Sequence, residues 1–296
     1  MQEPLISVIV PTFNRPDKLR GCLAALANLD YPRNRFEVIV VDDGSPTLLD
    51  SVVSGFREWL NVNLIRQENS GPAKARNRGA AIARGELLAF TDDDCAPDAK
   101  WLAHLEQAHL AAPGRMIGGK MLNGYANNVY STASQELIAY LYAYHESLGQ
   151  PRFFVTSNVA VPAQAFRSIG GFDVGFGLAA GEDRELCDRW LDRGGSLTFA
   201  PDAIVHHFHA LDFRRFVRQH MNYGRAAFHF HTIRAQRRDG KIRVEPLRFY
   251  LDMLGYPFGV FSGLKAVTVS ALFALAQSAN AAGFFREKLA RPGILP

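Results

Sequence analysis

Three carboxylates follow a short apolar run near residue 90, and this feature most restricts how the chain can fold. Residues 87 to 90 (LLAF) predict a buried strand, and Asp92, Asp93 and Asp94 come just after it. Three adjacent like charges cannot lie in an apolar core, so they must face solvent, a metal ion or both. In a chain of alternating strands and helices, this places them at the carboxyl edge of a sheet, where ligands of open α/β sheets bind.

The same three acids are typical ligands for a hard divalent ion. Mg2+ and Mn2+ are bound through oxygen atoms and are often shared with the phosphates of a substrate. An acidic surface turn or a helix cap is the alternative explanation, because Asp is common before helices. The sequence on either side favours a binding site.

The first 66 residues predict a strand–helix–strand–helix–strand unit. The strand segments are continuous and rich in β-branched residues, as in central parallel strands, and the helical segments have apolar residues at helical spacing. This order is the first half of a doubly wound α/β sheet. Strands are expected at 6–10, 36–41 and 61–66, and helices at 17–29 and 48–60.

Both early strands end in polar loops across which a nucleotide can lie. Asp43 can accept a hydrogen bond from a base N–H, while Thr12 and the ring of Phe13 can contact the edge and face of the base. Simple turn chemistry before Gly44 is the alternative for Asp43.

A basic segment then begins a helix expected at 72–84. Gly71 and Pro72 form a turn, and the helix N-terminus behind them suits an anion. Lys74 and Arg76 add positive charge close to it, which indicates a nearby phosphate or carboxylate. A solvated basic face is the alternative. The spacing of glycine and lysine does not match a Walker loop.

Six segments in this order resemble glycosyltransferase family 2, the nucleotide-sugar transferases with the GT-A fold. They are ISVIVPTFNR, VIVVDDGS, ENSGPAKARNRGAAIARGE, FTDDDC, TSNVAVPAQAFRSIGGFD and GEDREL, and the resemblance covers roughly residues 5 to 230. It implies a mixed, doubly wound α/β sheet with a nucleotide-binding half and an acceptor-binding half. We expect this GT-A-like domain at 1–210 and a helical, apolar extension at 211–296.

The resemblance also implies roles for individual residues. Asp183 matches the catalytic base, with Glu182 in a supporting or acceptor-binding role, and Asn158 matches a place that faces the donor sugar and the acceptor. The metal, Mg2+ or Mn2+, is expected at Asp92, Asp94 and His207, although a neighbouring histidine or a non-metal role remains open. Nucleotide-sugar contacts are expected from Pro11, Thr12, Phe13, Arg15, Asp43, Asn69, Gly71, Lys74, Arg76, Asp92 and Asp93.

The second half of the chain adds further expected elements. The aromatic stretch from 123 to 149 predicts a long helix whose rings either pack or stack on a sugar or lipid. Processive synthases of this family carry a Gln-x-x-Arg-Trp motif near residue 219, but Gln219 is followed by HMNY. Transfer of a single sugar is therefore expected. Other helices are predicted at 98–111, 181–191 and 214–238, and strands at 115–121 and 197–205.

Charge is unevenly distributed along the chain. The net charge is +4, but residues 214–248 contain ten Lys or Arg against two acids, a local net of +8, so the remainder carries 4 − 8 = −4. This pattern indicates a local anionic partner and not nucleic acid. Three scattered cysteines and no signal-peptide pattern favour a cytoplasmic location.

The C-terminal region contains a long uncharged run, residues 266–285. A bilayer-spanning helix, an interfacial helix and a soluble helical hairpin all fit it. The basic segment before it favours an anionic membrane surface, to which the enzyme would be bound peripherally or anchored.

The predicted function is transfer of one sugar from a UDP-, GDP- or dTDP-type donor to a hydroxyl acceptor, a glycan or a lipid-linked molecule, with inversion implied by the family. A nucleotidyltransferase that makes the sugar nucleotide is one alternative, but the loop after the first strand lacks the expected glycines and cations. A non-catalytic nucleotide-sugar-binding protein is another. The sequence does not specify the sugar, the base, the acceptor or the oligomeric state.

Overall fold

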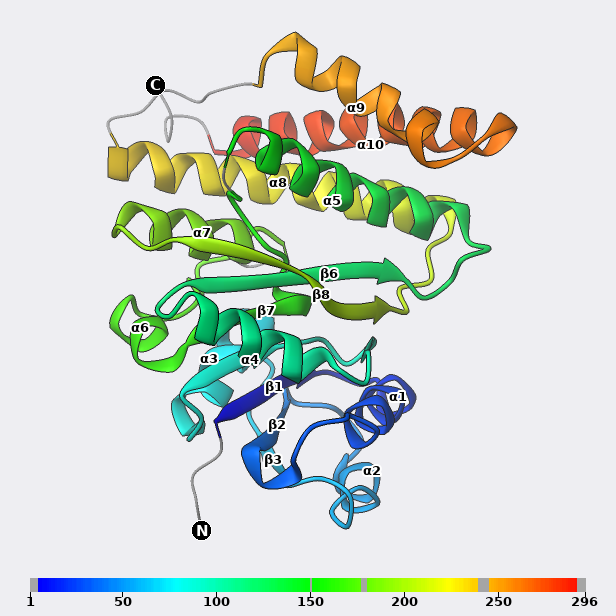
Figure 1. Ribbon diagram of the computed structural model, residues 1–296. Helices are drawn as coiled ribbons and strands as arrows, with labels where there is room; N and C mark the ends of the chain where they lie inside the picture. Colours follow the sequence, from blue (N-terminus) through cyan, green and yellow to red (C-terminus); the bar gives the residue numbers. More distant parts are fainter. Residues whose placement is uncertain (1–4, 150, 177–179, 239–244, 292–296) are drawn as a thin grey trace. The chain divides into compact units, whose positions relative to one another are not determined.

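The computed structural model describes residues 5–149, 151–176, 180–238 and 245–291, and it divides into two compact units (Figure 1). Unit 1 comprises residues 1–124 and 148–208, and unit 2 comprises residues 125–147 and 209–296. The predicted basic segment 214–248 therefore belongs to unit 2, and its residues 239–244 lie outside the described part of the chain.

Unit 1 is built on an eight-stranded mixed sheet in the order β3-β2-β1-β4-β7-β6-β8-β5. The first four strands in this order are parallel, and β7 pairs antiparallel with β4 and β6. This is the expected mixed α/β sheet. The strands are β1 (Ile6–Thr12), β2 (Phe36–Asp42), β3 (Val62–Arg66), β4 (Leu87–Phe90), β5 (Cys95–Pro97), β6 (Met116–Asn123), β7 (Val159–Pro162) and β8 (Leu197–His207).

Helices cover both faces of the parallel half of this sheet. On one face, α1 buries Leu19 and Leu23 in the same core cluster as Val8 of β1. On the other, Gly79 of α3 lies so close to Ile9 that a Cβ atom there would be 2.7 Å from the isoleucine side chain. Burial on both faces explains the uninterrupted apolar sequence of β1 and β2. The unit 1 helices are α1 (Pro16–Ala27), α2 (Asp50–Ser54), α3 (Pro72–Ile82), α4 (Trp101–Ala111), α6 (Ala163–Ser168) and α7 (Glu182–Asp192).

Three short elements and one helix length differ from the sequence predictions. Strands β5 and β7 and helix α6 span only three to six residues, too short for a hydrophobic period to be recognised. Helix α2 ends at Gly55, whereas a helix to residue 60 was expected. The rest of that segment forms turns and a bend, in which Leu60 is buried and Trp59 is 52% exposed.

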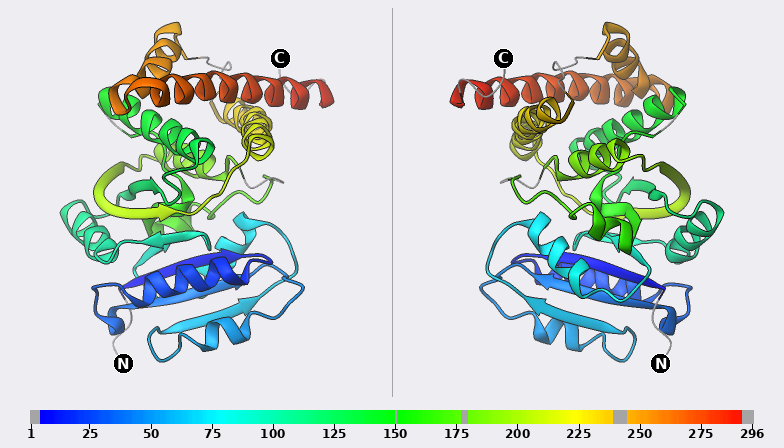
Figure 2. Two further views of the ribbon diagram at one scale, coloured as in Figure 1. Left: turned by 90° about the vertical axis from the view of Figure 1, so that its right-hand side faces the viewer. Right: turned by 90° about the vertical axis from the view of Figure 1, so that its left-hand side faces the viewer.

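Unit 2 is helical and has its own apolar core. It contains α5 (Val129–Ser147), α8 (Phe213–Arg238), α9 (Leu247–Val260) and α10 (Gly263–Ala290). Phe216 of α8, Met253 of α9 and Phe273 of α10 are buried together in this core. The long C-terminal helices are also seen in the two side views (Figure 2).

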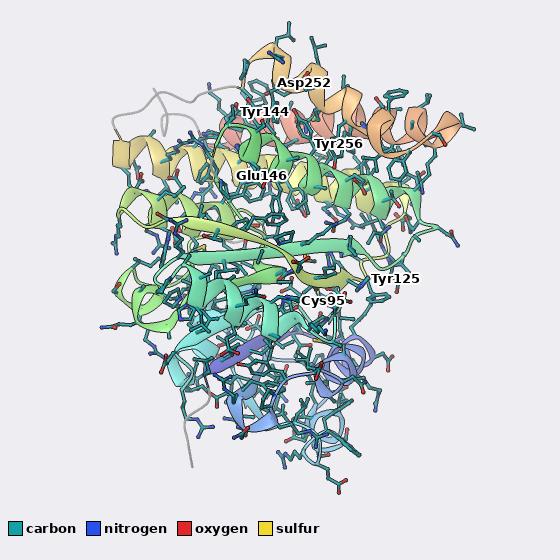
Figure 3. The ribbon with its side chains drawn as sticks, viewed as in Figure 1. Cys95, Tyr125, Tyr144, Glu146, Asp252 and Tyr256 are labelled. Atoms are coloured by element: carbon teal, nitrogen blue, oxygen red, sulfur yellow. The ribbon has the colours of Figure 1, made fainter. Side chains whose placement is uncertain are left out.

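The aromatic residues of α5 pack inside unit 2. The Tyr140 hydroxyl donates a hydrogen bond of 2.6 Å to the carbonyl of Phe249, and the Tyr144 ring lies 4.7 Å from the Phe249 ring. Tyr256 of α9 lies 5.5 Å from Tyr140. Tyr144 and Tyr256 are labelled in Figure 3. Of the two predicted uses of this aromatic stretch, packing accounts for these rings.

Candidate active site

The carboxyl ends of β1, β2 and β4 bring the predicted loops together. Thr12, the last residue of β1, is paired in register with Asp42 of β2. Its hydroxyl donates a 2.7 Å hydrogen bond to Asp93, which follows β4. Parallel strands end at the same edge of the sheet, so loops about 80 residues apart in sequence share one site, as the sequence predicted.

The three consecutive acids have three different surroundings. Asp93 is buried beside Thr12 and lies 3.2 Å from the Arg15 guanidinium. Burial raises the pKa of Asp93 to about 7, although Arg15 opposes the shift. Asp94 accepts a 2.9 Å hydrogen bond from the same guanidinium. Asp92 is 27% exposed and is paired with Arg76 at 2.7 Å.

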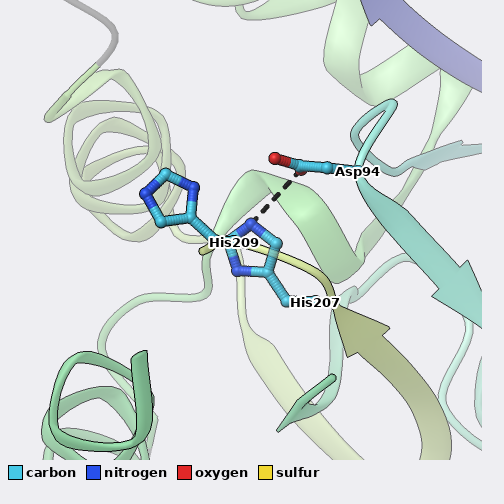
Figure 4. Close-up of side chains that lie close together, drawn as sticks. All are labelled: Asp94, His207 and His209. Carbon is cyan, nitrogen blue, oxygen red and sulfur yellow. Dashed lines mark ion pairs between the residues drawn. The ribbon is translucent and has the colours of Figure 1, made fainter. Parts of the chain in front are cut away.

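A group able to hold a metal ion forms around Asp94. The His207 Nε2 atom lies 3.3 Å from the Asp94 carboxylate (Figure 4). A carboxylate with imidazoles suits Mn2+ and other transition ions better than Mg2+. The residues therefore fit a divalent ion at Asp94 and His207.

Strand β5 is the reason that His207 faces the acids. It pairs antiparallel with the end of β8, and this pairing places Cys95, next to Asp94, opposite His207. His206 points elsewhere and lies 2.9 Å from Asp98. Asp92, predicted as a ligand, is not part of this group.

Arg76 connects the acids after β4 to the start of α7. It is 4% exposed, and its two terminal nitrogens pair with Asp92 at 2.7 Å and with Glu182 at 3.0 Å. A buried guanidinium requires such partners, because unpaired charge in the interior is costly. The predicted contact of Arg76 with the nucleotide stays a prediction, and the partners of Arg76 in the structure are protein carboxylates.

The predicted acid pair opens α7. Gly181 adopts a left-handed conformation with φ 87°, and the helix begins at Glu182. Besides its bond to Arg76, Glu182 has a second oxygen, Oε2, that is buried and has no partner among the described residues. Burial raises the pKa of Glu182 to about 7. Asp183 is partly buried and accepts a 2.7 Å hydrogen bond from the Arg184 backbone, and burial raises its pKa as well.

Asp43 shapes the loop that precedes α3. Its carboxylate accepts hydrogen bonds from the Gln67 side chain and from the backbone of Ser70 and Gly71, at 2.7 to 2.9 Å. These bonds hold the segment that carries Asn69, which is exposed. A hydrogen bond between Asp43 and the base stays a prediction. It would use a lone pair of the Asp43 carboxylate that these three hydrogen bonds leave unoccupied.

The other predicted nucleotide contacts differ in accessibility. Phe13 and Arg15 are exposed beside the acids, and Lys74 is exposed on α3. Pro11 is buried within β1, so only its backbone carbonyl or its ring edge can line the site.

The predicted contact of Asn158 with the sugar stays a prediction, and the structure gives this side chain three protein partners. Its side chain is fully buried, and its amide donates hydrogen bonds of 3.0 Å to the Lys120 carbonyl and 2.9 Å to the Ala203 carbonyl. Its oxygen accepts a 2.8 Å hydrogen bond from the Trp101 indole. The bulge between Gly119 and Lys120 opens the pairing of β6 and β8, and Asn158 satisfies the carbonyls freed there.

The family models and several relatives that match this chain are glycosyltransferases. The family model Glycosyl transferase family 2 matches residues 7–170, and Glycosyl transferase family group 2 matches residues 99–284. Glycosyltransferase AglE of Haloferax volcanii is 31% identical over 207 residues, which cover 69% of this chain and 67% of that protein. Validoxylamine A glucosyltransferase of Streptomyces hygroscopicus subsp. jinggangensis is 30% identical over a region that covers 73% of this chain and 61% of that protein. Pre-mycofactocin glycosyltransferase of Mycobacterium tuberculosis is 29% identical, and the chain spans 46% of its length.

Solved structures share the fold at low sequence identity. The mannosyltransferase PcManGT of Pyrobaculum calidifontis, in complex with GDP-Man and Mn2+, superposes with a TM-score of 0.63 at 20% identity, covering 95% of this chain and 88% of that one. Residues 1–349 of Staphylococcus aureus TarS superpose with a TM-score of 0.54 at 19% identity, covering 96% of this chain and 90% of that one. These likenesses establish the GT-A fold. Because a family model matches more than half of the chain and agrees with the order of the strand-end motifs, the chain belongs to glycosyltransferase family 2.

Proposed function

We propose that this protein is a metal-dependent inverting glycosyltransferase that moves one sugar from a nucleoside diphosphate sugar to a hydroxyl acceptor. The observation that carries the proposal is the chain of contacts from His207 and Asp94 through the neighbouring acids to Arg76 and the start of α7. It links a candidate metal site to a candidate base. We assign the catalytic domain to residues 1–210 and the extension to 211–296.

The donor would lie on the loops after β1, β2 and β4. The exposed ring of Phe13 offers a face for the base, and the segment held by Asp43 carries the exposed side chain of Asn69. Lys74 is placed on the exposed side of α3 near its N-terminus, where an anion is favoured. Donors of two kinds in related structures, GDP-Man with PcManGT and UDP-GlcNAc with TarS, support a nucleoside diphosphate sugar without selecting the base.

Asp94 and His207 would hold Mn2+ or Mg2+. Asp92, two residues before Asp94, would contribute by contacting the bound nucleotide sugar. When bound there, a divalent ion supplies stabilisation of the charge that develops on the diphosphate leaving group. Arg15 keeps the Asp93 and Asp94 carboxylates at the site by pairing with both. Asp93 itself, buried against Thr12, serves to fix the loop.

Asp183 would act as the general base. Its carboxylate accepts the proton of the acceptor hydroxyl while the hydroxyl oxygen bonds to the anomeric carbon and the bond from that carbon to the diphosphate oxygen breaks. A single displacement of this kind inverts the configuration. Arg76 and Glu182 hold the first turn of α7 and thus position Asp183. Its raised pKa makes Asp183 a better proton acceptor than an ordinary aspartate.

Replacement of the base tests this assignment. Asp183→Asn should lower turnover by about 10²- to 10⁴-fold, the usual contribution of a general base, and leave nucleotide affinity unchanged. Asp202→Asn, at an exposed position of β8, is the matched control and should keep full activity. Turnover is followed as nucleoside diphosphate release, and affinity by calorimetry. Near-normal turnover of Asp183→Asn would contradict the mechanism, and pyrophosphate as a product would instead indicate a nucleotidyltransferase.

The acceptor and the location are proposed from charge. We infer a glycan or lipid-linked hydroxyl acceptor, met at the cytoplasmic face of a membrane, because the +8 segment at 214–248 lies in unit 2 beside long apolar helices. Transfer to a lipid-linked acceptor in detergent, compared with transfer to a soluble glycan, tests the acceptor class.

A further inference from the structure

Helix α10 leaves one long uncharged face outside the core of unit 2. Positions 264, 267, 271, 274, 278, 281 and 285 follow one another at alternating steps of three and four and are all exposed. This spacing places them on one side of an α-helix. Large apolar side chains lie at both ends: Leu264 is 81% exposed, and Phe285 is 58% exposed. At about 1.5 Å per residue, the face is ~32 Å long.

Basic residues flank this uncharged face. Lys265 stands at its first turn, and Arg286 and Lys288 stand at its last, all exposed. The acid in this helix is Glu287, which is only 13% exposed and is paired with Arg225 at 2.8 Å and with Arg291 at 3.1 Å. The exposed charges of α10 are therefore all positive, which matches an anionic surface.

The packing of α10 argues against a helix that spans a bilayer. It is the one helix of the described chain that is long and apolar enough to cross a membrane, and 28% of its most apolar window is buried, so length, composition and burial alone do not exclude a crossing. Its other face packs closely on α8: a Cβ atom on Gly283 would be 2.0 Å from the carbonyl oxygen of Met221. A crossing would carry α8, including Arg218 and Arg225, into hydrocarbon, where charged side chains are expensive.

The same charges argue against a second copy of the chain as the occupant of this face. Both ends of the uncharged face are positive, with Lys265 at one end and Arg286 and Lys288 at the other. Pairing two such helices face to face, in either direction, would bring like charges together, which opposes association.

We propose that the outer face of α10 docks on an anionic lipid surface, with the helix axis parallel to the membrane plane. Leu264, Val267 and Phe285 enter the boundary between headgroups and acyl chains, while Lys265, Arg286 and Lys288 contact lipid phosphates. The purpose of this docking, to bring the enzyme to a membrane-bound acceptor, rests on the proposed function. The docking itself requires no turnover.

Vesicle binding tests the proposal with the purified full chain. Vesicles of phosphatidylcholine alone are compared with vesicles that contain roughly 30% phosphatidylglycerol, by flotation at low and high salt. Wild-type protein should bind only the anionic vesicles. One basic residue near such a surface is worth about fivefold in affinity, so K265Q/R286Q/K288Q should bind about a hundredfold more weakly. L264S/V267S/F285S should lose binding at both salt concentrations.

Matched controls come from unit 1. L48S/L110S removes two exposed leucines, and R20Q/R57Q/K100Q removes three exposed cations, none of which belongs to unit 2. Both controls should bind vesicles as the wild type does. Thermal unfolding of all four variants shows that each is folded.

Four results would overturn the proposal: equal binding to both kinds of vesicle, α10 variants that bind as the wild type does, a dimer that L264S/V267S/F285S dissociates, or vesicle-bound protein that alkaline carbonate does not release. The first three contradict an anionic lipid as the occupant of this face, and the last indicates a spanning helix.

Nucleoside diphosphate release with a soluble acceptor is measured in parallel. Protein that binds vesicles without transferring sugar contradicts the proposed function alone, and protein that transfers sugar but ignores vesicles contradicts this inference alone.

Discussion

His207 and its neighbour His206 differ in partner although they are adjacent in sequence. His207 faces Asp94, and His206 lies beside Asp98. We expect His207→Ala to weaken Mn2+-dependent nucleotide binding at least about tenfold, because loss of a ligand or of its support typically costs that much in metal affinity. His206→Ala is the control and should change binding little. Calorimetry with and without Mn2+ measures both, and equal losses in the two variants would argue against the assignment.

Glu182 should make the stability of the protein depend on pH near neutrality. Burial raises its pKa from 4.5 to about 7 even though Arg76 opposes the shift, so the folded state keeps a proton that the unfolded state has lost. The corresponding stability is fully present below pH ~4.5 and disappears as the pH rises through about 7, up to ~3 kcal/mol in all.

The Glu182→Gln variant should flatten this dependence, because glutamine does not titrate. The free energy of unfolding is measured by denaturant titration between pH ~5 and ~8. If the variant keeps the wild-type slope, other groups are responsible, and Asp183, whose pKa is also raised, is the next to be replaced.

At the scale of elements, the contact between α8 and α10 depends on glycine. A Cβ atom at Gly283 would lie 2.0 Å from the Met221 carbonyl oxygen, and one at Gly224 would lie 1.8 Å from the Asn280 carbonyl oxygen. Backbone atoms cannot give way as a side chain end can, so Gly283→Ala must separate the helices. We expect a loss of about 1–3 kcal/mol in the free energy of unfolding, similar to other overpacked cores.

A glycine of α9 provides the control for this prediction. Nothing lies within 4 Å of a Cβ atom at Gly255, so Gly255→Ala should instead gain about 0.5–1 kcal/mol from helix propensity. Thermal or denaturant unfolding of the two variants measures the difference. Opposite signs are expected, and a neutral Gly283→Ala would mean that the two helices are not in close contact.

At the scale of the whole molecule, nucleotide binding should raise the unfolding temperature only when metal is present. The donor loops hold several carboxylates, Asp92, Asp93 and Asp94 among them, and a diphosphate is repelled there unless a cation compensates. A ligand at 100 times its Kd adds ~2.7 kcal/mol to the stability of the state that binds it. UDP, GDP and dTDP are compared with and without Mn2+. A shift with one nucleotide that requires metal is the expected result, and an equal shift without metal would contradict it.

Some features of the fold are readable from short stretches of sequence. Strands β1, β2 and β4 are continuous apolar runs, because each is buried on both faces, and their predicted bounds agree with the structure to within two residues. Strand β5 has only three residues and exists because β8 offers it a partner. No local pattern signals such a strand, since its hydrogen bonds are made more than a hundred positions away.

Residue types in the site could be predicted, but their partners could not. Arg76 and Glu182 are separated by 106 positions, and Arg76 pairs with Asp92 and Glu182 because folding buries its guanidinium between them. Asn158 stands in a segment that resembles a sugar-binding one, but a bulge in the pairing of β6 and β8 occupies its amide. A polar side chain in a motif can face a ligand or a freed carbonyl, and only packing distinguishes the two.

The sequence by itself determined the family, the order of the main strands and the acids at the end of β4, because hydrophobic period and motif order are properties of neighbouring residues. The tertiary structure alone decided that Asp92 pairs with Arg76, that Asp93 is bonded to the Thr12 hydroxyl and that Asp94 faces His207. It also decided that α10 packs on one face and leaves the other uncharged face exposed. These outcomes depend on burial and on pairs of residues far apart in the chain, and burial is defined only once the elements have packed.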